Sequence, residues 1–133
     1  MLKRNIEEDL IPYCGKNNIG IVAYSPMQKG LLTGKFSPEH MKTLAPDDHR
    51  RDDPMFNGKQ LQKNMAIVDK LKVIAERNGK TVAQLAIAWV LRKEEVTAAI
   101  VGARKQKQIE ETVQAGDWVL SEDDIAEIEA ILP

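Results

Sequence analysis

Two short apolar runs constrain the fold of this 133-residue chain more than any other feature of its sequence. Residues 19–25, IGIVAYS, and residues 97–102, TAAIVG, are apolar almost throughout. Such runs are typical of strands that are buried on both faces of a parallel sheet. No other segment has the pattern of a strand, and two parallel strands are too few for a stable sheet. The sequence therefore predicts an α/β architecture whose sheet is incomplete.

Helical periodicity predicts five helices around these runs. Apolar side chains recur at spacings of three and four residues, and Thr81 and Ser121 are suitable N-cap residues for two of the segments. The segment that follows Thr81 is apolar nearly all round, so it is expected to be buried on most sides. The expected helices cover residues 3–16, 60–77, 82–92, 105–115 and 122–132.

Two of these helices carry specific expectations about their inward faces. Ile6 and Leu10 should face inward from the first helix, which Pro12 is expected to shorten or bend. Ile109 and Val113 should face inward from the fourth helix. The stretch from residue 28 to residue 58 has no periodicity, and a loop of this length is usually functional or disordered.

Charge and composition exclude several classes of partner and site. The chain has 19 basic and 20 acidic residues, so it offers no electrostatic surface for nucleic acid or for an anionic membrane. A helix-turn-helix reading of residues 81–111 is disfavoured because TAAIVG has the pattern of a strand rather than a turn. A single cysteine, Cys14, excludes an internal disulfide and a cysteine metal cluster. No apolar run is long enough to span a membrane, and a cytoplasmic location is expected.

Three blocks in the sequence resemble a known family. AYSPMQKGLLTGKF, TVAQLAIAWVL and IVGARKQKQIEET together are similar to the C-terminal part of the aldo-keto reductases, above all to the bacterial relatives of the voltage-gated potassium channel β subunit. The resemblance extends over essentially the whole chain. It implies a (β/α)8 TIM barrel, of which residues 1–133 would form one partial domain: the end of unit 6, units 7 and 8, and the C-terminal helix. Oligomerisation could complete such a barrel.

The first block implies one half of an NADPH site. Tyr24 stands at a strand end, where the family stacks an aromatic ring on nicotinamide. Ser25 and the backbone that follows it would contact the ribose or the pyrophosphate, and Lys35 could pair with the pyrophosphate. The loop beyond folds over the cofactor or substrate in the family, so Arg50 or Arg51 could assist.

The second block implies the other half of the NADPH site. Gly102 ends a strand, and the helix that starts soon after offers free N–H groups to an anion. Arg104 suits the adenosine 2′-phosphate and favours NADPH over NADH. Gln108, Glu111 and Thr112 share one helix face that would bind the 2′-phosphate and adenine, although the family often has Asn where Thr112 stands. The cofactor-binding set implied by the resemblance is Tyr24, Ser25, Pro26, Met27, Gly30, Leu32, Lys35, Gly102, Ala103, Arg104, Gln108, Glu111 and Thr112.

Other residue types that often carry chemistry match no motif in this sequence. His40 and His49 are expected to be solvated loop residues, and Trp89 and Trp118 to be packing residues. No residue matches the catalytic Asp, Tyr, Lys and His of the aldo-keto reductases, and no metal site is predicted. The resemblance therefore implies the cofactor-binding portion of an enzyme that reduces a small carbonyl substrate, inactive alone.

A non-enzymatic interpretation stays open beside this one. A part of a barrel leaves strand edges unpaired and apolar faces uncovered, which favours self-association or binding to a protein partner. Copies of the chain could pair their strands across a two-fold axis. Binding of NADPH by the isolated chain would separate the two interpretations.

Overall fold

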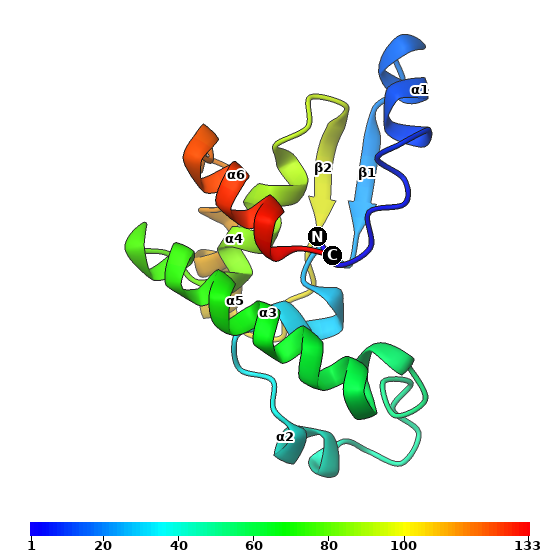
Figure 1. Cartoon of the computed structure of the whole chain (residues 1–133), viewed down its shortest axis with the longest axis vertical. Helices are drawn as coiled ribbons and strands as arrows, with labels where there is room; N and C mark the ends of the chain where they lie inside the picture. Colours follow the sequence, from blue (N-terminus) through cyan, green and yellow to red (C-terminus); the bar gives the residue numbers. More distant parts are fainter.

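A single two-stranded sheet lies to one side of the helices α3, α4 and α6 (Figure 1). A computed structural model describes residues 1–133, and β1 (Ile21–Tyr24) pairs in parallel with β2 (Val96–Ile100). In their register, Val22 lies beside Ala98 and Tyr24 lies beside Ile100. Because the strands are parallel, their carboxyl ends lie at the same end of the sheet.

The remaining elements are helices and short 3₁₀ segments. The two longest helices between the strands are α3 and α4, which pack against each other, and α4 also packs against β2. The elements follow the order α1 (Leu10–Lys16), β1, η1 (Gln28–Thr33), α2 (Pro38–Thr43), η2 (Pro54–Phe56), α3 (Gly58–Arg77), α4 (Val82–Leu91), β2, α5 (Gln106–Val113) and α6 (Glu122–Ile131). This α/β arrangement confirms the expected fold class.

The main core lies between α3, α4 and α6. Leu71, Trp89 and Ile128, one from each helix, are fully buried within it. The first eight residues of α4 are all buried, which confirms the prediction for this helix. Its cap is also confirmed: the Thr81 hydroxyl accepts from the backbone N–H of Gln84, and the Gln84 side chain accepts from the Thr81 N–H.

The stretch between residues 28 and 58 is more ordered than its sequence indicates. It contains η1, α2 and η2 and carries a second, smaller apolar cluster. Phe36 and Phe56 meet there edge to face, with ring centroids 5.1 Å apart. This cluster, completed by Leu31 and Leu61, anchors the stretch to the first turn of α3.

The prediction that both strands are buried on their two faces is wrong. In β1, Val22 is 58% exposed and Tyr24 is 81% exposed, and in β2 Ile100 is 59% exposed. Exposed and less exposed residues alternate along β1, and the register partners of Val22 and Tyr24, which are Ala98 and Ile100, are exposed as well, so one face of the sheet is open. The apolar runs were correctly read as strands, but nothing in this chain covers that face.

Two helical faces also differ from expectation. The first helix begins only at Leu10, so Pro12 lies in its first turn, where a backbone N–H is not needed. Ile6 and Leu10 are exposed, while Ile11 and Cys14 are the residues that the helix buries. The shorter helix has a different inward side because the predicted periodicity ran through residues that are not helical.

The α5 helix likewise does not bury its apolar face. Ile109 is 57% exposed and Val113 is 67% exposed, although both were expected to face inward. No residue of this helix is buried. None of the helices is both long enough and apolar enough to cross a lipid bilayer.

Candidate functional site

The loops that leave the carboxyl ends of the two strands meet beside the start of α4. Tyr24 and Ile100 are register partners, so the loop into η1 and the loop into α5 start next to each other. A hollow of about 170 Å³ lies between them. Its lining residues are Met27, Thr33, Lys35, Ala83, Gly102, Gln108, Glu111 and Thr112. Six of these eight belong to the predicted set, so the structure brings the two sequence blocks together.

The backbone after β1 is held in an uncommon conformation. Ser25, Gln28 and Lys29 have positive φ angles of 53°, 45° and 54°, and Gly30 follows at 97°. Only glycine adopts this region freely, and a left-handed residue with a side chain costs on the order of 1–3 kcal/mol. Such residues persist where surrounding contacts hold them, and they concentrate at ligand-binding segments.

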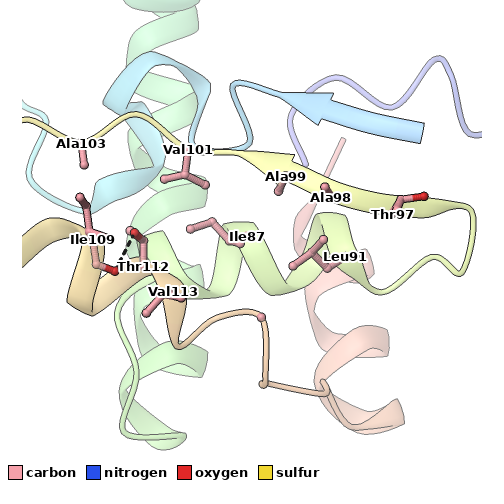
Figure 2. Close-up of a pocket in the computed structure, with 11 residues that line it drawn as sticks. Ile87, Leu91, Thr97, Ala98, Ala99, Val101, Ala103, Ile109, Thr112 and Val113 are labelled. Atoms are coloured by element: carbon pink, nitrogen blue, oxygen red, sulfur yellow. Dashed lines mark hydrogen bonds between the residues drawn. The ribbon is translucent and has the colours of Figure 1, made fainter. Parts of the chain in front are cut away.

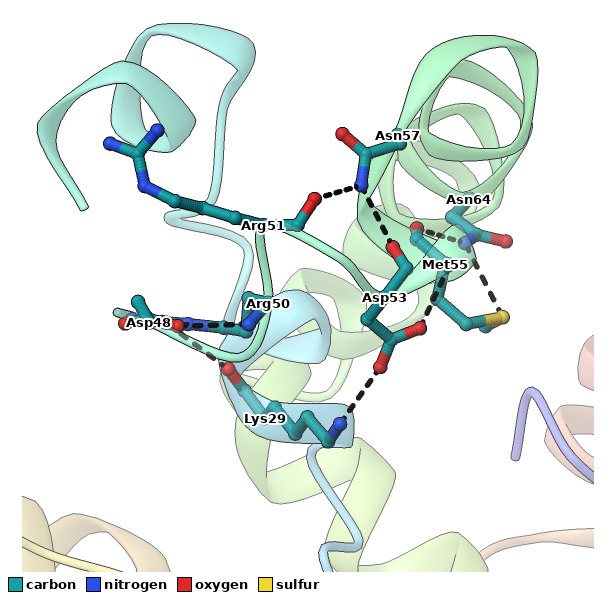
Figure 3. A network of polar contacts seen from close by, with 8 residues as sticks. All are labelled: Lys29, Asp48, Arg50, Arg51, Asp53, Met55, Asn57 and Asn64. Atoms are coloured by element: carbon teal, nitrogen blue, oxygen red, sulfur yellow. Dashed lines mark hydrogen bonds and ion pairs between the residues drawn. The ribbon is translucent and has the colours of Figure 1, made fainter. Parts of the chain in front are cut away.

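Contacts from residues 48–53 hold this turn in place, as Figure 3 shows. The Lys29 ammonium lies 2.8 Å from the Asp53 carboxylate, and the Lys29 carbonyl accepts a hydrogen bond from Arg50. Arg50 is itself fixed by two hydrogen bonds to Asp48, at 2.9 and 2.6 Å. The hydrogen bond from Lys29 lowers the pKa of Asp53, and that from Arg50 holds the pKa of Asp48 well below its usual range.

The same loop is tied to the start of α3. Arg51 donates to the backbone carbonyls of Leu44 and Ala45. Asn57, which directly precedes α3, donates to the carbonyls of Arg51 and Asp53 (Figure 3). These hydrogen bonds hold residues 51–53 against the start of α3. Both arginines of this loop are thus engaged in holding the loop and the η1 turn.

Side chains on α5 are engaged with the protein's own polar groups. The Gln108 side-chain oxygen accepts from the backbone N–H groups of Arg104 and Lys105, at 2.8 and 3.2 Å. It therefore occupies donors that a helix N-terminus would offer to an anion. The Thr112 hydroxyl donates to the Gln108 carbonyl, and the Glu111 carboxylate accepts from Thr81 at 2.9 Å.

The remaining predicted residues lie around the hollow rather than in it. Tyr24 and Ser25 are exposed on the open side of the sheet end, and Arg104 is exposed on the loop before α5. Neither Arg104 nor Lys35 forms an ion pair within the chain. Pro26 is buried and Leu32 packs in the main core, so the Leu32 side chain does not reach the hollow.

Several residues that shape the site carry no motif of their own. Gln84 donates to the Glu111 carbonyl at 2.8 Å, which fixes α5 against the start of α4. Thr33 donates to the Gly30 carbonyl and accepts from the Lys35 N–H, which shapes the turn between them. Thr33 stands inside the first sequence block and could have been included from its position, whereas the pairing of Gln84 with Glu111 is visible only in three dimensions.

A second, larger hollow of about 570 Å³ lies beneath β2 (Figure 2). It is bounded by β2, α4 and α5, and Ile87, Leu91, Ile109 and Val113 line it. Ala103 of the predicted set lines this larger hollow, not the smaller one. Most of its lining residues are hydrophobic and none is charged, so it offers no opposite charge to a charged ligand.

This chain is similar in sequence to known proteins over its whole length. The sequence matches the aldo/keto reductase family over residues 1–133. It is 35% identical over 133 residues to aldo-keto reductase YhdN from Bacillus subtilis and 36% identical over 130 residues to probable aldo-keto reductase 1 from Glycine max. These alignments cover 99% and 98% of this chain but only 40% and 37% of the relatives.

A solved structure of a related protein has a similar fold. The glycerol dehydrogenase AKR11B4 from Gluconobacter oxydans superposes with a TM-score of 0.88 at 35% sequence identity. The superposition covers 97% of this chain and 38% of that one. The chain thus spans about 40% of the length of these relatives, and its two strands and their helices correspond to part of a (β/α)8 barrel.

Proposed function

This chain belongs to the aldo/keto reductase family, and we propose that it forms the NADPH-binding portion of a carbonyl reductase of that family. The observation that carries the proposal is the convergence of the loops after β1 and β2 on one hollow, with Lys35 and Gln108 both lining it. Barrel enzymes bind phosphate groups in the corresponding loops, at the carboxyl ends of their last two strands.

The residues present fit part of a dinucleotide. A hollow of about 170 Å³ is smaller than the roughly 300–1,000 Å³ of sites that enclose a whole drug-sized ligand. It suits one phosphate and its sugar, while the rest of the cofactor would lie along the exposed Tyr24 and Ser25. Lys35 and Arg104 bring two positive charges that no carboxylate in the chain neutralises.

Each residue has a distinct proposed role. Tyr24 stacks on the nicotinamide ring, Lys35 pairs with the pyrophosphate, and Arg104 binds the adenosine 2′-phosphate. Gln108 already accepts from the backbone N–H groups beside Arg104, so its side chain must turn away before an anion can use them. When bound, NADPH supplies the hydride that reduces a carbonyl group.

The chain is proposed to need further residues for catalysis. None of its side chains matches the family's Asp, Tyr, Lys and His, so we expect the isolated chain to bind the cofactor without reducing an aldehyde or ketone. We also assign residues 1–133 to the end of the sixth barrel unit, the seventh and eighth units and the tail helix. The sequence blocks favour the branch that includes the potassium channel β subunit relatives, and a cytoplasmic location is proposed with it.

Calorimetric titration of the purified chain with NADPH and with NADH tests the proposal. We expect saturable binding that is stronger for NADPH. Arg104→Ala should weaken NADPH binding roughly tenfold to a hundredfold, the value of a charge-assisted hydrogen bond, and should leave NADH binding unchanged. Lys35→Ala should weaken both cofactors equally because both contain the pyrophosphate. Lys70→Ala, an exposed lysine on α3, is the matched control.

Two results would contradict the proposal. The first is the absence of saturable binding to a chain whose circular dichroism shows it to be folded. The second is an Arg104→Ala variant that loses NADPH and NADH affinity to the same extent, because the guanidinium would then not be reading the 2′-phosphate.

A further inference from the structure

The free edge of β2 is unprotected against pairing with another strand. The strand is hydrogen-bonded to β1 on one side only, because the sheet has two strands. Its five residues, VTAAI, include no charge and no proline. Natural edge strands usually carry lysine, proline or a bulge that blocks further pairing. β2 has no lysine or proline, and its one register irregularity lies near its start, at Thr97, while Ala98 to Ile100 keep a regular register with β1.

The chain exposes more surface than a folded protein of its size. Its accessible surface is 8,571 Å² at 14.9 kDa, whereas a monomer of this mass has roughly 7,000 Å². Part of the difference comes from the α2 segment, which projects from the helices in Figure 1. The excess of roughly 1,500 Å² still exceeds the share of about 800 Å² that each partner buries in a standard interface.

An apolar hollow runs along this edge and would receive side chains from an added strand. Thr97, Ala98 and Ala99 all line the 570 Å³ hollow, so the hollow extends along most of β2. Ile109 and Val113 form its opposite wall and remain more than half exposed (Figure 2). Covering them would remove apolar area from water, the usual source of association energy.

Charges at the two ends of β2 indicate which partner fits. Glu94 and Glu95 directly precede the strand, after Lys93, while Arg104, Lys105 and Lys107 follow it. A strand laid antiparallel to β2 with the same flanks would place its acidic start beside this basic end, and its basic end beside this acidic start. Parallel pairing of two copies would instead bring like charges together.

We propose that two copies of this chain associate through antiparallel pairing of their β2 strands across a two-fold axis. The contact uses the same surface on both copies, so it closes as a dimer and does not extend into a filament. It produces a four-stranded sheet in which apolar side chains from each copy enter the hollow of the other. This inference goes beyond the proposed cofactor binding and does not depend on it.

Analytical ultracentrifugation of the full chain at concentrations from about 1 to 100 µM tests the dimer. Ala98→Lys puts a charge at the centre of the pairing edge, and Val113→Lys puts one on the opposite wall of the hollow. Each should weaken dimerisation at least tenfold, because like charges then face each other or enter an apolar hollow. Val119→Lys, at an exposed apolar position outside the hollow, is the matched control and should dimerise normally.

A charge exchange tests the antiparallel register without disturbing the strand. Glu94→Lys and Lys105→Glu should each weaken the dimer when studied alone, because each places like charges at both ends of the interface. An equimolar mixture of the two variants should form a heterodimer, since the exchanged charges complement each other again. Circular dichroism of each variant checks that it is folded.

Three outcomes would overturn the proposal. The first is a chain that stays monomeric at the highest concentration, which would contradict dimerisation. The second is the formation of polymers without a defined size, which would show that the contact does not close around a two-fold axis. The third is a dimer that persists in Ala98→Lys and Val113→Lys, or a mixture of the two charge variants that does not associate. Either result would show that the interface lies elsewhere.

Discussion

Replacing Glu7 by glutamine should destabilise the chain more than any other change of a single carboxylate. Glu7 accepts hydrogen bonds from Arg92 at 3.1 and 3.2 Å and also pairs with Arg4 at 3.0 Å. The side chain of Arg92 is only 8% exposed, and its guanidinium lies over the Trp89 ring, 3.5 Å from the centroid. These contacts attach the N-terminal segment to the end of α4.

The magnitude follows from the burial of Arg92. Burial lowers the pKa of Arg92, and the carboxylate of Glu7 opposes this shift by stabilising the charged guanidinium. At the effective dielectric of a protein surface, two charges at this separation attract by about 5 kcal/mol, and desolvation offsets a large part of that gain. Glu7→Gln keeps an acceptor but leaves the Arg92 charge uncompensated. We expect a loss of roughly 2–3 kcal/mol, somewhat below that for fully buried pairs.

Urea unfolding followed by circular dichroism, at one fixed protein concentration, measures this loss. For m values of roughly 1–2 kcal/mol/M, the urea midpoint should fall by about 1–3 M while m stays constant. Glu8→Gln is the matched control, because this neighbouring carboxylate is exposed and forms no ion pair. Its midpoint should be unchanged.

The double variant Glu7→Gln with Arg92→Met provides the decisive comparison. Removing the buried guanidinium together with its partner should restore part of the lost stability, because no uncompensated charge remains and methionine can still pack on Trp89. The reasoning would be refuted if Glu7→Gln costs no more than Glu8→Gln. The reasoning would also be refuted if the stability loss of the double variant equals the sum of the losses measured for Glu7→Gln and for Arg92→Met alone.

The other predictions concern the core, the cofactor turn and acid stability. Leu71→Ala should lower the free energy of unfolding by about 2–5 kcal/mol in urea unfolding, because it opens a cavity in a fully buried part of α3. Asp53→Asn should change stability little but weaken NADPH binding severalfold in calorimetry, since it frees Lys29 from its left-handed turn. Burial, the largest single effect, raises the pKa of Glu7 and of Asp124, but the hydrogen bonds and positive charges of their partners together outweigh it and leave both pKa values lowered. A lowered pKa stabilises the fold fully above the ordinary carboxyl pKa of about 4, so unfolding midpoints should fall as the pH drops below about 4. Asp124→Asn should make that decline shallower.

Helices were predictable from the sequence where local signals agree. The α4 helix has a capping box at Thr81 and an apolar surface all round, and both features are local to the segment. Ser121 likewise caps α6 by accepting from the Asp124 N–H. Signals of this kind operate within four residues, so they act in the same way whatever the rest of the chain does.

Burial of the strands could not be predicted because it depends on elements beyond the segment itself. Val22, Tyr24 and Ile100 have the apolar character of residues covered on both faces, yet they lie on an open face in this structure. Ile109 and Val113 show the same discrepancy on α5. In each case the side chains fit a larger assembly, such as a complete barrel or a second copy. The apolar pattern predicts that these side chains are buried, but it does not identify the element that buries them.

The candidate site was predictable in outline and not in its contacts. Two blocks about 70 residues apart, each at a strand end, were expected to meet because parallel strands end on the same side. The engagement of Gln108 with the N–H groups before α5 was not foreseen, nor was the ion pair between Lys29 and Asp53. Partners separated by 24 positions in a loop without periodicity have no local sequence pattern that would join them.

The two proposals are independent of each other, but both involve α5, so we expect cofactor binding and dimerisation to influence each other. Thr112 lines the small hollow with Gln108 and Glu111, and it also lines the large hollow with Ile109 and Val113. A partner strand that covers Ile109 and Val113 would therefore restrain the same helix whose other face is proposed to bind the cofactor. Because such coupling between sites is reciprocal, NADPH should change the dimer affinity by the same factor by which dimerisation changes NADPH affinity. Sedimentation with and without saturating NADPH measures that factor, and equal dimer dissociation constants in the two conditions would show that α5 binds cofactor equally well with its apolar face covered or open.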